Sequence, residues 1–293
     1  TIQSGGNLSV KGGMGPNAIA EIRTATGTQL IRSRSILEVT GGSNTGAAAR
    51  IVNTGTGNQQ VGESRRFSFI SAAPYQTGTI NVAAGTAADA IAEITAVGPQ
   101  QVYVSGGTLA VAGGGPSAFA RIETASTAEQ TIGCPAYAGS CQTAIGTLNI
   151  VAGTGAGSYA RISTPGFQRV TANSAINLSG SVTDASAILT GVGQDIRSGN
   201  LVLAAGAGNN ANALVQSTAA QNIVGSPSLA GGGSAGATAT AQIIATGDQT
   251  IRGFGLSNLN GGAGDNSLAR IFTAGNQTFN YGTLNMTGGP ATG

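Results

Sequence analysis

The chain has 293 residues and a formal net charge of +2, with only 8% of its residues charged and 4% aromatic. It contains no His, which excludes Ser-His-Asp and Cys-His catalysis and any His-ligated metal. Its Arg residues are spread along the chain and not gathered into the basic patch of a nucleic-acid-binding protein. We therefore expect no nucleic-acid partner. No apolar run reaches the ~18–20 residues of a membrane-spanning helix, so we expect no membrane-spanning segment.

The composition also bears on whether the chain folds. Gly contributes 49 residues, and low-complexity polar tracts are often disordered. Here, however, 40% of the residues are hydrophobic, and they recur in a fixed order. A disordered chain usually combines low hydrophobicity with high net charge, so we expect an ordered fold.

An internal repeat is marked by a recurring Gln. The nine members of this Gln column are Gln29, Gln59, Gln100, Gln130, Gln168, Gln194, Gln221, Gln249 and Gln277. Most neighbours in the column are 26 to 30 residues apart, and two intervals are longer, at 41 and 38 residues. The repeat is therefore about 28 residues long, and we expect one domain over residues 1–293 with about ten copies.

Each copy contains the same succession of short apolar segments. In the first copy these lie at Ile2, at 8–10 and at 18–22, with Gly12-Gly13 between the last two. Apolar residues alternate with others inside each segment, which predicts strands with one inward side. We expect the Gly-Gly and Gly-x-Gln sequences to form corners, because Gly accepts the positive φ that a corner needs.

The same succession returns in a middle copy over 102–124, in a late copy over 251–273, and in a final partial copy from 278. One coil cannot bury its apolar side alone, so the copies must stack in parallel register about 4.8 Å apart. The expected fold is an all-β parallel β-helix, or β-solenoid, of about ten rungs. Helical repeats do not fit, because Gly and β-branched residues interrupt the pattern throughout. A β-sandwich would not keep so regular a register.

One outward position alternates in charge. Glu21, Arg50, Glu93 and Arg121 occupy it in four successive copies. In stacked rungs such neighbours suit cross-strand pairing. They equally suit independent solvated charges, since each exposed pair contributes only ~0.2–1 kcal/mol.

Two insertions, at about 62–78 and 133–144, account for the two long intervals. They hold an unusual share of the aromatic and cationic residues, which are Arg65, Arg66, Phe67, Phe69, Tyr75 and Tyr137. Insertions in solenoids often support binding. We expect each insertion to be either a loop that contacts a ligand or subunit, or an extra hairpin that covers one flank.

The second insertion also contains both cysteines. Cys134 and Cys141 bracket a short loop whose spacing suits a disulfide and does not match CxxC redox chemistry. A disulfide would imply an oxidising compartment. Two free thiols are the alternative.

No catalytic constellation is recognisable. Polysaccharide-cleaving β-helices need convergent carboxylates, a calcium-binding Asp cluster or an Arg or Lys base. The eleven acidic residues are dispersed along the chain, and the calcium-binding nonapeptide has only one off-spacing echo, at 261–265. We therefore expect no enzyme activity, no metal and no cofactor.

The Gln-x-Ile, Leu-x-Val-x-Gly-Gly and Ala-x-Ile-x-Thr segments together resemble the repeats of filamentous-haemagglutinin-like exoproteins. These are secreted or surface proteins of Gram-negative bacteria, many exported by two-partner secretion. The resemblance covers essentially the whole chain as a pattern, although the amino-terminal secretion domain of that family is not evident. It implies a right-handed parallel β-helix outside the cell, acting as an adhesin stalk or a fibre component.

We therefore expect a non-enzymatic extracellular protein, structural or adhesive, of a surface, matrix or biofilm fibre. Its partners would be further copies stacked end to end, or a host or neighbouring cell surface or glycan. The alternative is a β-helix that binds or cleaves glycans, which needs acids or aromatics on neighbouring rungs. An ice-binding solenoid would need a flat, regular Thr array, and the Thr positions are irregular.

Overall fold

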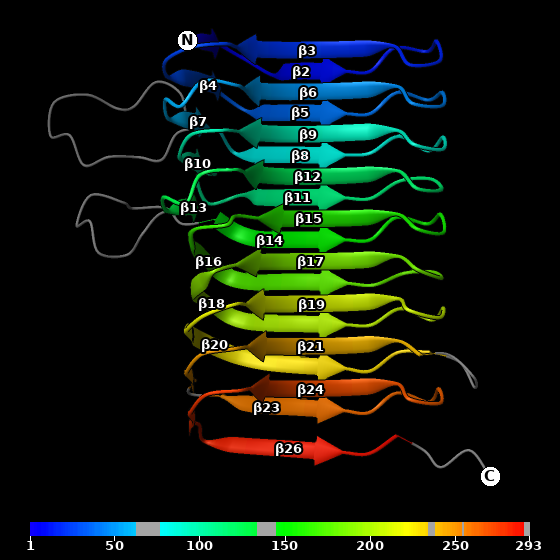
Figure 1. Ribbon diagram of the computed structural model, residues 1–293, viewed down its shortest axis with the longest axis vertical. Coiled ribbons are helices and arrows are strands. Elements are labelled where there is room, and N and C mark those ends of the chain that lie inside the picture. Colours follow the sequence, from blue (N-terminus) through cyan, green and yellow to red (C-terminus); the bar gives the residue numbers. More distant parts are fainter. Residues whose placement is uncertain (63–76, 134–144, 234–237, 254, 290–293) are drawn as a thin grey trace, which may run out of the picture.

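The structure is a computed structural model that describes residues 1–62, 77–133, 145–233, 238–253 and 255–289. These residues form an all-β solenoid without helices, in which all strand pairs are parallel (Figure 1). The coils stack along the long axis of the molecule, and the strands lie across that axis. The described residues make nine complete three-stranded coils and two strands of a tenth, which confirms the predicted β-solenoid and its spacing of about 28 residues.

The first face of each coil contains the Gln column. Its strands are β1 (Ile2–Ser4), β4 (Gln29–Ser33), β7 (Gln59–Val61), β10 (Gln100–Val102), β13 (Gln130–Ile132), β22 (Gln249–Arg252), β25 (Gln277–Asn280), and the first parts of β16 (Phe167–Ser179), β18 (Gly193–Ala204) and β20 (Gln221–Ala230).

The second face follows in each coil. Its strands are β2 (Leu8–Lys11), β5 (Ile36–Thr40), β8 (Thr79–Ala83), β11 (Thr108–Ala112), β14 (Ile145–Val151), the last parts of β16, β18 and β20, β23 (Leu256–Asn260) and β26 (Thr283–Thr287). Because β16, β18 and β20 run round the corner, the first two faces belong to one hydrogen-bonded sheet.

The third face closes the coil as a separate sheet. Its strands are β3 (Ile19–Thr24), β6 (Ala48–Asn53), β9 (Ile91–Ala96), β12 (Phe119–Thr124), β15 (Tyr159–Ser163), β17 (Ser186–Gly191), β19 (Asn212–Ser217), β21 (Thr240–Ala245) and β24 (Leu268–Thr273).

The core consists of columns of like side chains, one from each coil. On the third face Ile94 pairs with Ile122, which pairs with Ile162, and all three are fully buried. The adjacent inward column is Ala, as in Ala92 and Ala120. Each alternating strand thus places its apolar residues inward, and stacking removes them from water, which is the main stabilising term.

The corner between the second and third faces differs from the prediction. Gly-Gly does not supply its positive φ; instead the residue just before the buried Ala or Ser does, for example Asp89, Asp184 and Asn210 with φ of 57°, 56° and 54°. Asn and Asp tolerate this left-handed conformation better than other non-Gly residues. Gly12 is needed for another reason: a Cβ there would lie 2.5 Å from the backbone nitrogen of Gly42 in the next coil.

Candidate functional site

The Gln column forms one continuous ladder of side-chain amides. Each Nε2 from Gln59 to Gln277 donates to the Oε1 of the preceding Gln, at 2.7 to 2.8 Å. The Gln side chains from Gln29 to Gln249 are at most 2% exposed. The ladder lies inside the corner between the third and first faces, where Gln100 Nε2 also donates to the carbonyl of Ile94 at 3.1 Å. It aligns the coils and leaves no reactive group accessible.

A network of ion pairs crosses the outer side of the third face. Glu93 forms ion pairs with Arg50, whose Nε lies 3.1 Å away, and with Arg121, whose Nη2 lies 2.7 Å away, on the two neighbouring strands. Glu123 joins Arg121 to Arg161, with both contacts at 3.1 Å. The predicted cross-strand pairing is therefore confirmed for Arg50, Glu93 and Arg121. The alternative, in which these side chains are independent solvated charges, is wrong for these three residues.

Aromatic rings border this network. Phe119 and Tyr159 stack with their centroids 4.9 Å apart and their planes 1° from parallel. The guanidinium of Arg121 lies 5.2 Å from the Phe119 centroid, and that of Arg161 lies 5.4 Å from the Tyr159 centroid. Burial lowers the pKa of Arg121, but the charge and hydrogen bond of Glu93, together with the nearby Glu123 and Tyr159, outweigh it and the pKa is raised. Burial raises the pKa of the Tyr159 phenol. The network joins three Arg and two Glu side chains, and each of Arg50, Arg121 and Arg161 contacts at least one carboxylate.

A shallow depression of about 350 Å³ lies on the outer side of the first face, over β16, β18, β20 and β22. We call it the Phe167 depression. Its lining includes Phe167, Asp195, Arg197, Ala220, Asn222 and Asp248. The Phe167 side chain is 40% exposed, in a chain with few aromatic residues.

Polar side chains hold one another in place at this depression. Asp195 accepts from Arg197 Nε at 3.2 Å, from Arg169 Nη1 at 3.5 Å and from Asn222 Nδ2 at 2.8 Å. Asp248 Oδ1 accepts from the backbone and side-chain nitrogens of Asn276 at 2.9 and 3.2 Å. The Phe167 depression therefore presents fixed hydrogen-bonding groups beside an aromatic ring.

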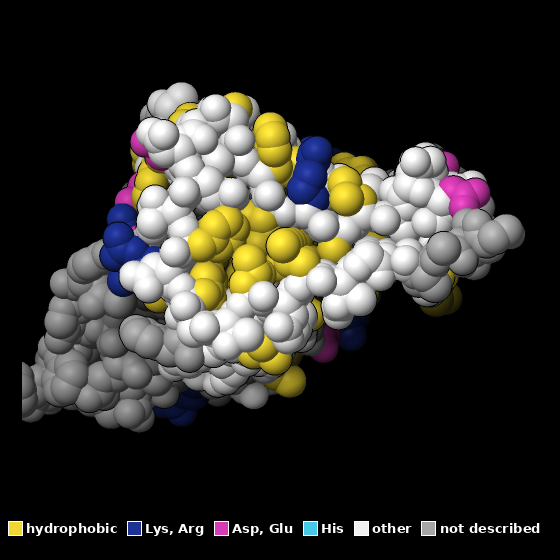
Figure 2. Space-filling view, turned by 90° about the horizontal axis from the view of Figure 1, so that it is seen from below, with side chains coloured by type: hydrophobic (Ala, Val, Ile, Leu, Met, Phe, Trp, Pro, Cys, Tyr) yellow, Lys and Arg dark blue, Asp and Glu magenta, His cyan; other side chains and the backbone are white. Residues whose placement is uncertain are grey.

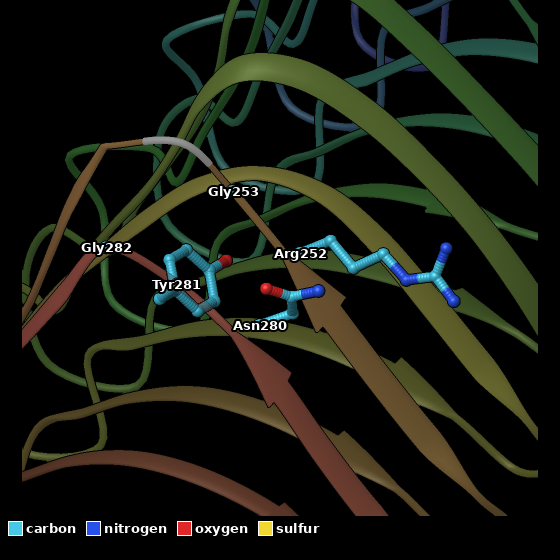
Figure 3. A pocket seen from close by; sticks show the side chains of 5 residues that line it. All are labelled: Arg252, Gly253, Asn280, Tyr281 and Gly282. Atoms are coloured by element: carbon cyan, nitrogen blue, oxygen red, sulfur yellow. The ribbon is translucent and has the colours of Figure 1, made fainter.

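A second depression, of about 300 Å³, lies where the first face turns into the second in the last two coils (Figure 3). The Tyr281 hydroxyl donates to the carbonyl of Gly225, two coils away, at 2.8 Å. A Cβ on Gly253 would lie 2.5 Å from the Tyr281 ring, so Gly253 makes room for it. The Arg252 guanidinium extends away from this ring. Tyr281 thus contacts both preceding coils and forms part of the wall of the depression.

The predicted contact loops lie outside the described residues. Arg65, Arg66, Phe67, Phe69, Tyr75 and Tyr137 are all in those stretches, as are Cys134 and Cys141. The contact surface and the disulfide therefore stay predictions. The described residues do show where both insertions begin: Gly62 and Gly133, with φ of 78° and 81°, end β7 and β13 at the same corner, two coils apart.

The described residues contain neither a metal-binding cluster nor a membrane-spanning helix. No group of three or more His, Cys, Asp or Glu side chains is placed there to hold a metal ion. Over the same ranges, no helix is long and apolar enough to cross a membrane.

The sequence pattern had not indicated the Phe167 depression. A signal exists in the position just before each ladder Gln, which holds Phe167, Gly193, Ala220 and Asp248 in four successive coils. Comparison with known proteins adds no assignment, since no family model, curated protein or solved structure matches the chain.

Proposed function

We propose that this chain is a non-enzymatic extracellular protein, structural or adhesive, and that copies of it stack end to end as segments of a surface or matrix fibre. The observation behind this proposal is the apolar interior at the end of the stack (Figure 2). In the last described coil Phe279, Leu284 and Met286 are 39%, 39% and 74% exposed. Their counterparts in the middle coils are fully buried by the next coil.

The first coil has complementary residues in the same columns. Through successive strand pairs, Phe279 shares its column with Ile2, and Met286 shares its column with Val10. A second copy placed in register would bury these columns as an internal coil does, and it would continue the backbone ladders of the first two faces. We therefore propose that a second copy of the chain covers the last coil of the stack.

The cell-surface setting rests on the repeat pattern. Its resemblance to filamentous-haemagglutinin-like exoproteins supports a secreted or surface protein of a Gram-negative bacterium with an adhesive or biofilm role. The extended, regular stack suits a stalk that holds binding elements away from a surface.

Electron microscopy and sedimentation velocity of the purified 293-residue chain test the proposal. We expect rods that lengthen with protein concentration. Met286→Lys should suppress this growth, because it places a charge at the apolar contact. The matched control is Val97→Lys, an exposed apolar residue in the third coil and away from both ends of the stack, which should leave growth unchanged. Monomers at every concentration, or growth insensitive to Met286→Lys, would contradict end-to-end stacking.

A further inference from the structure

The Phe167 depression owes its shape to one column of side chains. Between Phe167 and Asp248 the same column holds Gly193 and Ala220, whose side chains are too small to fill it. Two carbons of the Phe167 ring lie 3.0 and 3.5 Å from where a Cβ on Gly193 would be, so the ring overlies Gly193. Three strand spacings separate the coils of Phe167 and Asp248, which makes the depression about 14 Å long.

The adjacent outward column supplies polar groups at each step. Asp195, Asn222 and Thr250 follow one another on successive strands. They offer a carboxylate, an amide and a hydroxyl, which between them donate and accept hydrogen bonds. The Asp195 side chain is only 10% exposed and is held by its partners, so it is already oriented before a ligand arrives.

The charges at this site leave no excess of positive charge. Asp195 lies within 3.5 Å of both Arg169 and Arg197, and Arg169 also pairs with Glu129 at 3.0 Å. The Arg169 guanidinium also lies 5.7 Å from the Phe167 centroid. Because the Arg side chains are engaged by Asp195 and the ring, the site lacks the excess of positive charge that an acidic or sulfated ligand needs.

We infer that the Phe167 depression binds a neutral oligosaccharide. A sugar ring has an apolar C–H face, which packs on an aromatic ring, and an edge of hydroxyls, which pair with carboxylates and amides. The depression provides both features side by side, and its volume of about 350 Å³ is within the range of small-ligand sites. The regular strand spacing presents the polar groups as a row, which suits a linear chain of sugar units.

This inference deepens the proposed adhesive function by naming a ligand class for the scaffold, and it rests on that function only for its biological meaning. Fibre growth and saccharide binding involve different parts of the molecule. The end of the stack governs the first, and the first face over β16–β22 governs the second. Each can therefore fail while the other succeeds.

Calorimetric titration of the full chain with neutral trisaccharides tests the inference. The probes are maltotriose, cellotriose, mannotriose and tri-N-acetylchitotriose, with trigalacturonate as an acidic comparison. We expect at least one neutral trisaccharide to bind and trigalacturonate not to bind. Phe167→Ala should weaken binding on the order of tenfold, because it removes the packing surface for the sugar face.

A second variant keeps the test valid if Phe167→Ala does not fold. Ala220→Lys places a long side chain in the depression from an exposed position and should weaken binding at least as much. The matched control is Ala25→Lys, also exposed but in the first coil, which should leave affinity unchanged. The inference is wrong if no neutral trisaccharide binds, if only trigalacturonate binds, or if both site variants bind as well as the unmodified chain.

Discussion

The Gln ladder shows how a single residue type fixes the register of the whole stack. Each amide from Gln59 onward gives one hydrogen to the preceding Gln and, in several coils, the other to a backbone carbonyl. All eight amide–amide bonds point the same way, so their dipoles add along the axis. A coil displaced by one residue would turn its Gln outward and leave its neighbours unpaired.

Replacing one Gln in the middle of this ladder tests how much the ladder contributes to the free energy of unfolding. Gln130→Leu leaves Gln100 Oε1 without its donor and Gln168 Nε2 without its acceptor. Each of the two orphaned buried groups costs about 1–3 kcal/mol, so we expect a loss of about 2–6 kcal/mol. The urea midpoint of unfolding measures it. Gln101→Leu, on the outward side of β10, is the control and should shift stability by less than ~0.5 kcal/mol.

The buried phenol of Tyr281 makes the stability of the folded chain depend on pH. Its burial raises the pKa of the phenol from 10.0 to about 12, so the folded chain favours the protonated form. The contribution of Tyr281 to stability is therefore complete below about pH 10 and is lost as the pH rises towards 12. Melting temperatures of the unmodified chain and Tyr281→Phe, compared across this window, check it. A difference between the two proteins that does not change with pH would contradict the account.

At the scale of the element, the corner between the second and third faces repeats one backbone feature. Its left-handed residue is Asn, Asp, Ser or Gly in the coils where it is described, among them Asn210 and Asp184. Asn210 Nδ2 also donates to Asp184 Oδ1 at 2.9 Å, so neighbouring corners are linked. The corner therefore depends on both a backbone conformation and a side-chain contact.

Adjacent asparagines separate these two contributions. Asn210 has a positive φ and Asn209 does not, although both are exposed. We expect Asn210→Val to lower stability by about 1–2 kcal/mol, because a β-branched residue is strained in this conformation. Asn209→Val should change stability little, and Asn210→Gly should keep the backbone while losing only the side-chain contact. Urea unfolding of the three variants measures this; equal losses for Asn209→Val and Asn210→Val would show that the conformation is unimportant.

The alternation in each strand and the Gln spacing were sufficient to predict the strands, their parallel register and the Gln column. That the Gln amides point inward and bond to one another is seen only in the structure. The role of Gly-Gly was predicted wrongly, because close approach of neighbouring backbones, as at Gly12, is visible only when coils are stacked. The Phe167 depression was missed for a similar reason. It depends on small residues one and two coils away, Gly193 and Ala220, which no local pattern singles out.

At the scale of the whole molecule, one coil geometry is propagated along a single axis. The backbone ladders, the apolar columns and the Gln ladder all run parallel to that axis (Figure 1). Each coil stabilises mainly its two neighbours, so the apolar columns are uncovered only where the stack stops. In the proposed end-to-end assembly, a further copy would use backbone and apolar contacts of the kind that the interior coils make.

X-ray diffraction from aligned fibres of the 293-residue chain is the most direct test of this account. End-to-end stacking keeps the solenoid axis along the fibre, so the strand spacing of about 4.8 Å must give a strong reflection on the meridian. A reflection at this spacing on the equator would mean that the solenoids lie across the fibre and associate by their flanks. That result, or the absence of ordered fibres at any concentration, would contradict the proposed end-to-end stacking.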